Sequence, residues 1–294
     1  MPESIGIAIP FYSGVGFLAE ALRSLLQQRD EGWMAVVVDD ASPEAGAAEL
    51  VASLGDARVT YVRNEVNLGL AANFNRCLEV TGCDLVTIFH ADDVLLADYV
   101  GTVRAAAESV PTATCVAPLA VVIDGSGQRS DTLADRVKRL LWPRSQRVLL
   151  EGDRGLARLM HGQFMYCPAV AYRTRLLPDM GFDNALCQVM DLDLYTRILL
   201  GGGTILLDRT PVYAYRRHAG TTTARNTAAF VRLGEETALA RRTAEEAARR
   251  GWRRTRRAAR MRWTTRLNGV LSVMTGRSAS RELRRGAWRD ITRP

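Results

Sequence analysis

Two adjacent carboxylates, Asp92 and Asp93, follow the apolar, β-prone run 85–89, and His90 precedes the first of them by two residues. A buried strand that ends in such residues places charge at the carboxyl edge of a sheet, where open α/β sheets bind their ligands. Two neighbouring carboxylates repel each other unless a cation or hydrogen-bond donors offset their charge. Carboxylate oxygens suit Mg²⁺ or Mn²⁺, which usually share their shell with substrate phosphates. The stretch therefore predicts either a metal site or a solvated turn in which one carboxylate caps the next helix.

Two earlier apolar runs also end in residues that could bind a ligand. Phe11 and Tyr12 follow the first run of the chain, and Asp39 and Asp40 follow the second. An aromatic ring can stack on a nucleobase, and a carboxylate can accept a hydrogen bond from the ring N–H of a base. Parallel strands would bring all three ends to one edge of the sheet, which predicts a nucleotide site. The alternative is that each end is only a turn.

The elements that must position these residues alternate along the chain, and this alternation predicts an α/β fold with a doubly wound, mostly parallel sheet flanked by helices. Residues 124–153 are polar and basic and are expected to form a long loop. The expected strands are 5–10, 33–38, 59–63, 84–89, 114–123, 169–173, 204–207 and 212–215, and the expected helices are 17–28, 45–54, 71–80, 94–108, 155–160 and 189–199.

Four motifs in this order resemble the family 2 glycosyltransferases, which are inverting enzymes with the GT-A nucleotide-sugar fold. The resemblance covers about residues 5–222. Its motifs are Ile9-Pro10-Phe11-Tyr12, Val38-Asp39-Asp40-Ala41-Ser42, Asn67-Leu68-Gly69 with Asn75, and His90-Ala91-Asp92-Asp93. The family often has Asp at the position of His90, so the Asp-X-Asp pattern is incomplete in this chain.

The resemblance implies a nucleoside diphosphate sugar as donor and Mg²⁺ or Mn²⁺ as cofactor. Tyr12 would stack on the base and Asp40 would hydrogen-bond to it. Asp92 would lie near the ribose and diphosphate, and Asp93 would hold the metal. His218, in an Arg-Arg-His segment near the end of the resemblance, would ligate the metal as a neutral imidazole or pair with phosphate as a cation. The donor residues implied are Pro10, Phe11, Tyr12, Asp40, Asn67, Gly69, Asn75, Asp92 and His218.

A second carboxylate site is expected at Asp191, at the start of the helix 189–199. A carboxylate is favoured there by the helix dipole, so an ordinary N-terminal cap is an alternative. The resemblance assigns Asp191 as the catalytic base, with Met190 in place of the family's Glu and Asp193 as a lesser candidate. Residues expected on the acceptor side are Trp142, Met165 and Tyr166.

The end of the chain differs from the rest in charge. Residues 240–294 hold 17 arginines and four acidic residues, a charge of +13, which leaves −6 for the remainder of a chain with net charge +7. We expect a catalytic domain at 1–227, with a donor half at about 1–123 and an acceptor half at about 124–227, and an Arg-rich helical extension at 228–294. One helical stripe of this extension contains Trp252, Ala259, Trp263, Leu267, Val270 and Met274.

Tryptophan and arginine together suit contact with an anionic membrane, here through about residues 240–274. The alternative is a helical appendage that packs on the catalytic domain. No nucleic acid is expected as partner, because the basic tail carries none of the usual binding motifs. No apolar run is long enough to span a bilayer, there is no secretion signal, and the five cysteines show no metal-ligand spacing. These features predict a cytoplasmic protein, peripheral on the inner face of the membrane if the tail binds lipid.

The expected function is inverting, metal-assisted transfer of a sugar to a hydroxyl acceptor, which could be a glycan, a lipid-linked sugar or a natural product. One alternative is a nucleotidyltransferase of similar fold, but residues 9–16 contain no lysine or arginine for a phosphate loop. The other is a non-catalytic protein that binds partners through its basic tail.

Overall fold

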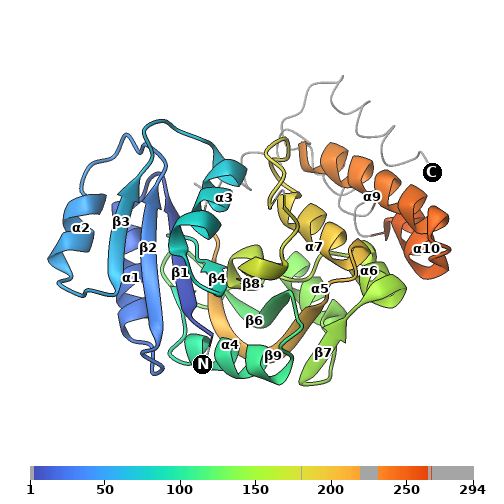
Figure 1. Ribbon diagram of the computed structural model, residues 1–294, viewed down its shortest axis with the longest axis horizontal. Coiled ribbons are helices and arrows are strands. Elements are labelled where there is room, and N and C mark those ends of the chain that lie inside the picture. Colours follow the sequence, from blue (N-terminus) through green and yellow to red (C-terminus); the bar gives the residue numbers. More distant parts are fainter. Residues whose placement is uncertain (1–2, 180, 219–230, 264–265, 267–294) are drawn as a thin grey trace.

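A computed structural model describes residues 3–179, 181–218, 231–263 and 266 (Figure 1). Helices flank a central sheet, so the predicted α/β class is confirmed. The strands are β1 Ile5–Phe11, β2 Trp33–Asp39, β3 Val59–Arg63, β4 Leu85–Ile88, β5 Val94–Leu95, β6 Cys115–Ile123, β7 Arg147–Leu150, β8 Ala171–Arg173 and β9 Ile205–Arg216. The α-helices are α1 Val15–Leu26, α2 Ala47–Ser53, α3 Leu70–Thr81, α4 Tyr99–Ser109, α5 Leu133–Leu141, α6 Gly152–His161, α7 Met190–Leu200, α9 Val231–Arg249 and α10 Arg253–Met261.

The first half of the chain forms the parallel part of the sheet, in the order β3-β2-β1-β4. The register pairs Phe11 with Asp39, and Asp39 in turn with Arg63, so these strands end level with one another. β4 continues beside β1, where the Phe89 N–H donates to the Ala8 carbonyl at 2.8 Å. The three predicted strand ends therefore meet at one edge of the sheet.

The second half adds strands in both directions. β8 is antiparallel to β4 and to β6, whereas β6 and β9 are parallel. The two short strands expected near the end are one strand, β9, whose pairing with β6 shifts register between Pro118 and Ala120. The helix expected to begin at Val94 begins instead at Tyr99, because Val94 and Leu95 form β5 against β9.

The prediction of a long loop at 124–153 was wrong, because this segment contains α5 and β7. Helix α5 begins with a reciprocal cap in which the Thr132 hydroxyl donates to the Asp135 carboxylate at 2.6 Å, while the Asp135 N–H donates to the Thr132 hydroxyl at 3.3 Å. Strand β7 is paired antiparallel with β9. The segment is therefore ordered by a helix and a paired strand and is not an open insertion.

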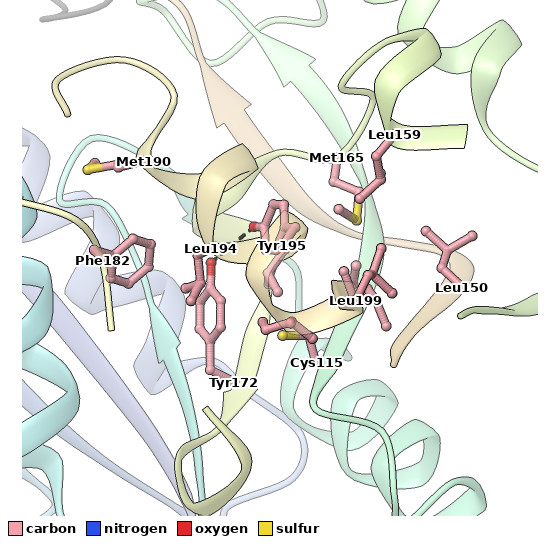
Figure 2. Close-up of a cluster of buried hydrophobic side chains, with 14 of the residues drawn as sticks. Cys115, Leu150, Leu159, Met165, Tyr172, Phe182, Met190, Leu194, Tyr195 and Leu199 are labelled. Atoms are coloured by element: carbon pink, nitrogen blue, oxygen red, sulfur yellow. Dashed lines mark hydrogen bonds between the residues drawn. The ribbon is translucent and has the colours of Figure 1, made fainter. Parts of the chain in front are cut away.

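The tail helices α9 and α10 pack on the rest of the described chain (Figure 1). Ala244 of α9 and Ala258 and Ala259 of α10 belong to the same buried cluster as α6 and α7. Figure 2 shows the centre of this cluster, where the Tyr172 and Tyr195 hydroxyls lie 3.0 Å apart. Among the described helices, none has the length and apolar composition of a membrane span.

Candidate active site

The two carboxylates after β4 lie in different environments. The Asp92 side chain is 29% exposed, and its Oδ2 lies 2.9 Å from His218 Nε2. Asp93 is 1% exposed; its Oδ2 accepts from the Tyr213 hydroxyl at 2.7 Å and its Oδ1 from the Arg216 backbone N–H at 2.6 Å. Burial, with the neighbouring charge of Asp92, raises the pKa of Asp93 well above its usual value. The Asp93 carboxylate thereby anchors β9 to the turn, and its predicted role as a metal ligand stays a prediction.

His90 completes a group of possible metal ligands. One ligand atom from each of His90, Asp92 and Asp93 lies within 4.8 Å of the others. The buried His90 Nε2 has no hydrogen-bond partner among the described residues, which is unusual for a buried polar atom. Burial lowers the pKa of His90, although the charges of Asp92 and Asp191 oppose this change, so the imidazole is neutral at pH 7. An unpaired neutral imidazole and the accessible Asp92 carboxylate fit a divalent cation.

The end of β1 presents one of its two aromatic rings to solvent. Tyr12 is 49% exposed, and its backbone carbonyl accepts the Ser42 hydroxyl at 2.6 Å. Phe11 is buried in the core beneath it, and Pro10 is partly buried. The Tyr12 ring is therefore free to stack on a ligand, whereas the Phe11 ring faces the core, and the donor role of Phe11 stays a prediction.

Asp40 organises the loop between β3 and α3. Its side chain is buried, and its Oδ1 accepts from Asn64 Nδ2 at 3.0 Å and the Leu68 N–H at 2.8 Å. Its Oδ2 accepts from the Gly69 N–H at 3.0 Å, which also donates to Asn67 Oδ1 at 2.9 Å. The three predicted donor residues Asp40, Asn67 and Gly69 thus lie together, but the Asp40 oxygens are engaged by the loop.

Asn75 connects the donor half to the segment before α7. Its Oδ1 accepts from the Phe182 N–H at 2.7 Å, and its Nδ2 donates to the Phe182 carbonyl at 2.8 Å and to Asn184 Oδ1 at 3.2 Å. These bonds satisfy the side chain within the protein. The Asn75 side chain therefore links α3 to the segment before α7.

Asp191 lies in the first turn of α7, as predicted. It is partly exposed, and its Oδ2 accepts from Gln163 Nε2 at 3.1 Å. The buried Gln163 Oε1 has no partner among the described residues. The charge of Asp191 opposes the lowering of the His90 pKa, so the two residues interact electrostatically. Asp193, the lesser candidate, forms ion pairs with Arg197 at 2.8 Å and Arg242 at 3.5 Å, so its carboxylate is engaged by two arginines.

The acceptor side contains a charged network around Tyr166. Its hydroxyl donates to Asp135 Oδ1 at 2.7 Å, and Arg217 donates to the same oxygen at 2.6 Å. Burial would raise the pKa of Asp135, but hydrogen bonds from Arg217, Thr132 and Tyr166 outweigh it and lower this pKa to about 2. Lys138 Nζ lies 4.0 Å from the Tyr166 ring centre, and desolvation together with nearby arginines lowers its pKa to about 8.

Two other residues predicted on the acceptor side are core residues. Trp142 is 5% exposed and packs edge-on against Phe164, with ring centres 5.4 Å apart. Met165 is 1% exposed and lies in the cluster of Figure 2. Both side chains are buried in the core, and their predicted contact with an acceptor stays a prediction.

Sequence reasoning missed several residues that hold the site. Arg216 donates from Nε to the Asp92 carbonyl at 2.6 Å and pairs with Glu20 at 2.7 Å. Glu235 of α9 binds three backbone N–H groups just before α7. The Thr132–Asp135 spacing of α5 was the one available local signal. The contacts of Arg216 and Glu235 join distant parts of the chain and leave no local pattern.

Comparisons with known proteins agree with this geometry. The family model described as "Glycosyl transferase family 2" matches residues 6–176. An uncharacterized protein of Mycobacterium tuberculosis, MT1568, is 31% identical over 227 residues, which cover 74% of this chain and 68% of that protein. The putative colanic acid biosynthesis glycosyl transferase WcaA of Escherichia coli is 29% identical over 90 residues, covering 30% of this chain and 32% of WcaA.

Solved structures share the fold at low sequence identity. The S. aureus TarS 1–349 structure in complex with UDP-GlcNAc has a TM-score of 0.64 and 18% identity, covering 83% of this chain and 66% of that one. The chain spans only 39% of the longer TarS structure. The mannosyltransferase PcManGT from Pyrobaculum calidifontis, in complex with GDP-Man and Mn²⁺, has a TM-score of 0.61 and 14% identity, covering 99% of this chain and 84% of that one.

Proposed function

The chain belongs to glycosyl transferase family 2, and from this premise we propose that it moves a sugar from a nucleoside diphosphate sugar to a hydroxyl acceptor with inversion at the anomeric carbon. The observation that carries the proposal is the group of residues at the strand ends together with the electrostatic interaction of one of them, His90, with Asp191. Tyr12, Asp92, His90 and His218 surround the ends of the parallel strands, and Asp191 lies within electrostatic reach of His90. The residues at the strand ends suit a donor, and Asp191 suits a base that acts on the acceptor.

On the donor side, Tyr12 would stack on the base, and Asp92, His90 and His218 would hold Mg²⁺ or Mn²⁺. The 29% exposure of Asp92 and the unpaired His90 Nε2 support these ligands over Asp93. The bound cation would neutralise the charge that develops on the diphosphate leaving group. Complexes of structural neighbours with UDP-GlcNAc and with GDP-Man and Mn²⁺ support a sugar nucleotide and a divalent metal in this chain.

On the acceptor side, Asp191 is the general base. It takes the proton of the acceptor hydroxyl while the acceptor oxygen forms a bond to the anomeric carbon, and the bond from that carbon to the diphosphate oxygen breaks. Direct displacement needs no enzyme nucleophile and therefore inverts the configuration. Gln163 orients Asp191 by donating a hydrogen bond from its Nε2 to the Asp191 carboxylate.

The acceptor need not be soluble, because α10 offers a basic surface for an anionic membrane. Its buried side contains Thr255, Ala258 and Ala259, and its outer side carries exposed arginines. A groove there is lined by Arg253, Arg256, Arg257, Arg260, Met261 and Arg266. In the predicted aromatic stripe, Trp252 is partly buried and packs against the core, so that part of the stripe faces the protein; Leu267, Val270 and Met274 lie outside the described residues.

A product assay with Asp191→Asn tests the function. The full chain would be incubated with UDP- and GDP-sugars, a hydroxyl acceptor panel and Mn²⁺ or Mg²⁺, with proton NMR to give the anomeric configuration. We expect an inverted product, and in Asp191→Asn unchanged donor affinity with kcat lower by roughly 10²-fold or more, the scale of a positioned base. Asp183→Asn, a partly exposed carboxylate before α7, is the matched control. A retained configuration, or full turnover in Asp191→Asn, would overturn the assignment.

A further inference from the structure

Helix α5 exposes two of its leucines to solvent. Asp135 is 3% exposed and faces the body, and Lys138 lies over the Tyr166 ring. In contrast, Leu133 is 72% exposed and Leu140 is 84% exposed. These two leucines are seven residues apart and therefore lie on one side of the helix. A surface helix of a globular protein normally turns such residues toward the core, so this side of α5 is available for a partner.

The surroundings of these leucines are basic. Arg136 lies one turn from each leucine and is exposed, and Arg144, beyond the end of α5, is exposed as well. Arg139 is paired with Asp131 at 2.5 Å. We define the outer face of α5 as Leu133, Arg136 and Leu140. This face combines exposed apolar side chains with positive charge.

We propose that the outer face of α5 docks on a membrane that contains anionic lipid. Leucines that enter the boundary between headgroups and acyl chains leave water, and flanking arginines remain beside the lipid phosphates. A second copy of the chain fits this face less well, because a twofold contact would set the arginines of one copy against the same arginines of the other. Negative lipid supplies both the apolar phase and the opposite charge.

This inference does not depend on the transferase reaction, but it adds a second contact to the proposed membrane surface of α10. Helix α6 connects the two regions. Arg158 of α6 donates to the Leu141 carbonyl at the end of α5 at 3.3 Å, and Asp153 of α6 accepts the Thr255 N–H of α10 at 2.7 Å. Variants in α5 and in α10 can therefore be tested separately on one rigidly packed scaffold.

The test uses the full chain with Leu133→Ser and Leu140→Ser combined. Both side chains are exposed, so the variant should keep the melting temperature and donor turnover of the native protein. Cosedimentation would be measured with vesicles of phosphatidylcholine alone and of phosphatidylcholine with phosphatidylglycerol. We expect the partition onto anionic vesicles to fall roughly tenfold or more in the variant. Val66→Ser, which removes an apolar side chain that is 63% exposed in the donor half, should leave it unchanged.

Three results would overturn the proposal. The first is unchanged partition of the double variant. The second is a native dimer that the double variant converts to monomer without loss of vesicle binding, which would make the face a subunit interface. The third is loss of binding in Arg253→Gln with Arg257→Gln while the α5 variant binds normally, which would leave α10 as the lipid surface without α5.

Discussion

Replacement of Glu235 should separate acceptor chemistry from donor binding. The Glu235 carboxylate accepts hydrogen bonds from three consecutive backbone N–H groups, those of Cys187 at 2.9 Å, Gln188 at 2.8 Å and Val189 at 3.1 Å. These groups lead directly into α7, whose first turn carries Asp191. A carboxylate near a helix N-terminus is also favoured by the helix dipole. Glu235 therefore fixes the position from which the proposed base projects.

The magnitude follows from these three bonds. In Glu235→Ala, three N–H groups lose a charged acceptor, and each such bond contributes about 1.5–3 kcal/mol when water cannot replace it. Water can reach the Cys187 N–H, which is exposed, so we expect the free energy of unfolding to fall by about 2–4 kcal/mol in total. A shift of the base by about 1 Å can cost on the order of 10²-fold in rate. Glu235→Gln keeps one acceptor oxygen and should show a smaller loss of both quantities.

The assay combines urea unfolding, donor calorimetry and acceptor kinetics. Donor affinity should be unchanged in Glu235→Ala, because Tyr12 and Asp92 follow strands β1 and β4 and are not held by Glu235. In contrast, kcat should fall by about 10- to 100-fold. Glu245→Ala, an exposed change on the same helix, is the matched control. Native kcat in Glu235→Ala would refute the positioning role. Equal losses of donor affinity and kcat would show general loosening of the fold instead.

Four further substitutions probe the donor site and the predicted acceptor side. Tyr12→Ala should weaken nucleoside diphosphate binding by about 1–3 kcal/mol, the scale of base stacking, and unchanged affinity in calorimetry would make Tyr12 a turn residue. Asp92→Asn should remove the Mn²⁺ dependence of donor binding while Asp93→Asn keeps it, and the opposite pattern would return the metal to Asp93. Asp135→Asn should cost about 2 kcal/mol of stability at pH 7, because its pKa falls from 3.8 to about 2 on folding. This contribution is complete above pH 4 and is lost as the pH falls through 2, so urea unfolding of the two proteins should converge in acid; a constant difference would contradict the ion pair with Arg217.

Much of the donor half could be predicted from the sequence because its signals are local. Apolar runs between breaking residues gave β1, β2 and β3 to within one residue at each end. Parallel pairing then required the residues after these strands to meet. The same reasoning failed at α5, because that helix buries Asp135 and exposes Leu133 and Leu140. The amino-acid composition of α5 is therefore also typical of a solvated loop.

The roles of Asp92 and Asp93 could not be separated by sequence reasoning. The two residues are identical and adjacent, and the difference between them comes from Tyr213 and Arg216, more than a hundred residues later in the chain. Those residues hold the Asp93 carboxylate in the core and leave Asp92 beside His218. A motif can thus mark the location of a site, while the assignment of each carboxylate depends on contacts made by the last strand.

The tail contributes to the site by the same kind of distant contact. The family match ends at residue 176, before α7, and Glu235 lies beyond it on α9. Glu235 holds the N-terminal end of α7, and Arg250 donates to the Leu200 carbonyl at the C-terminal end. Arg250 itself is the first residue after α9, so α7 is held at both ends by α9 and the turn that follows it, and it cannot shift along its axis without breaking one of these contacts. The basic tail therefore has a structural reason to remain docked beside Asp191, whether or not its outer arginines also meet a membrane.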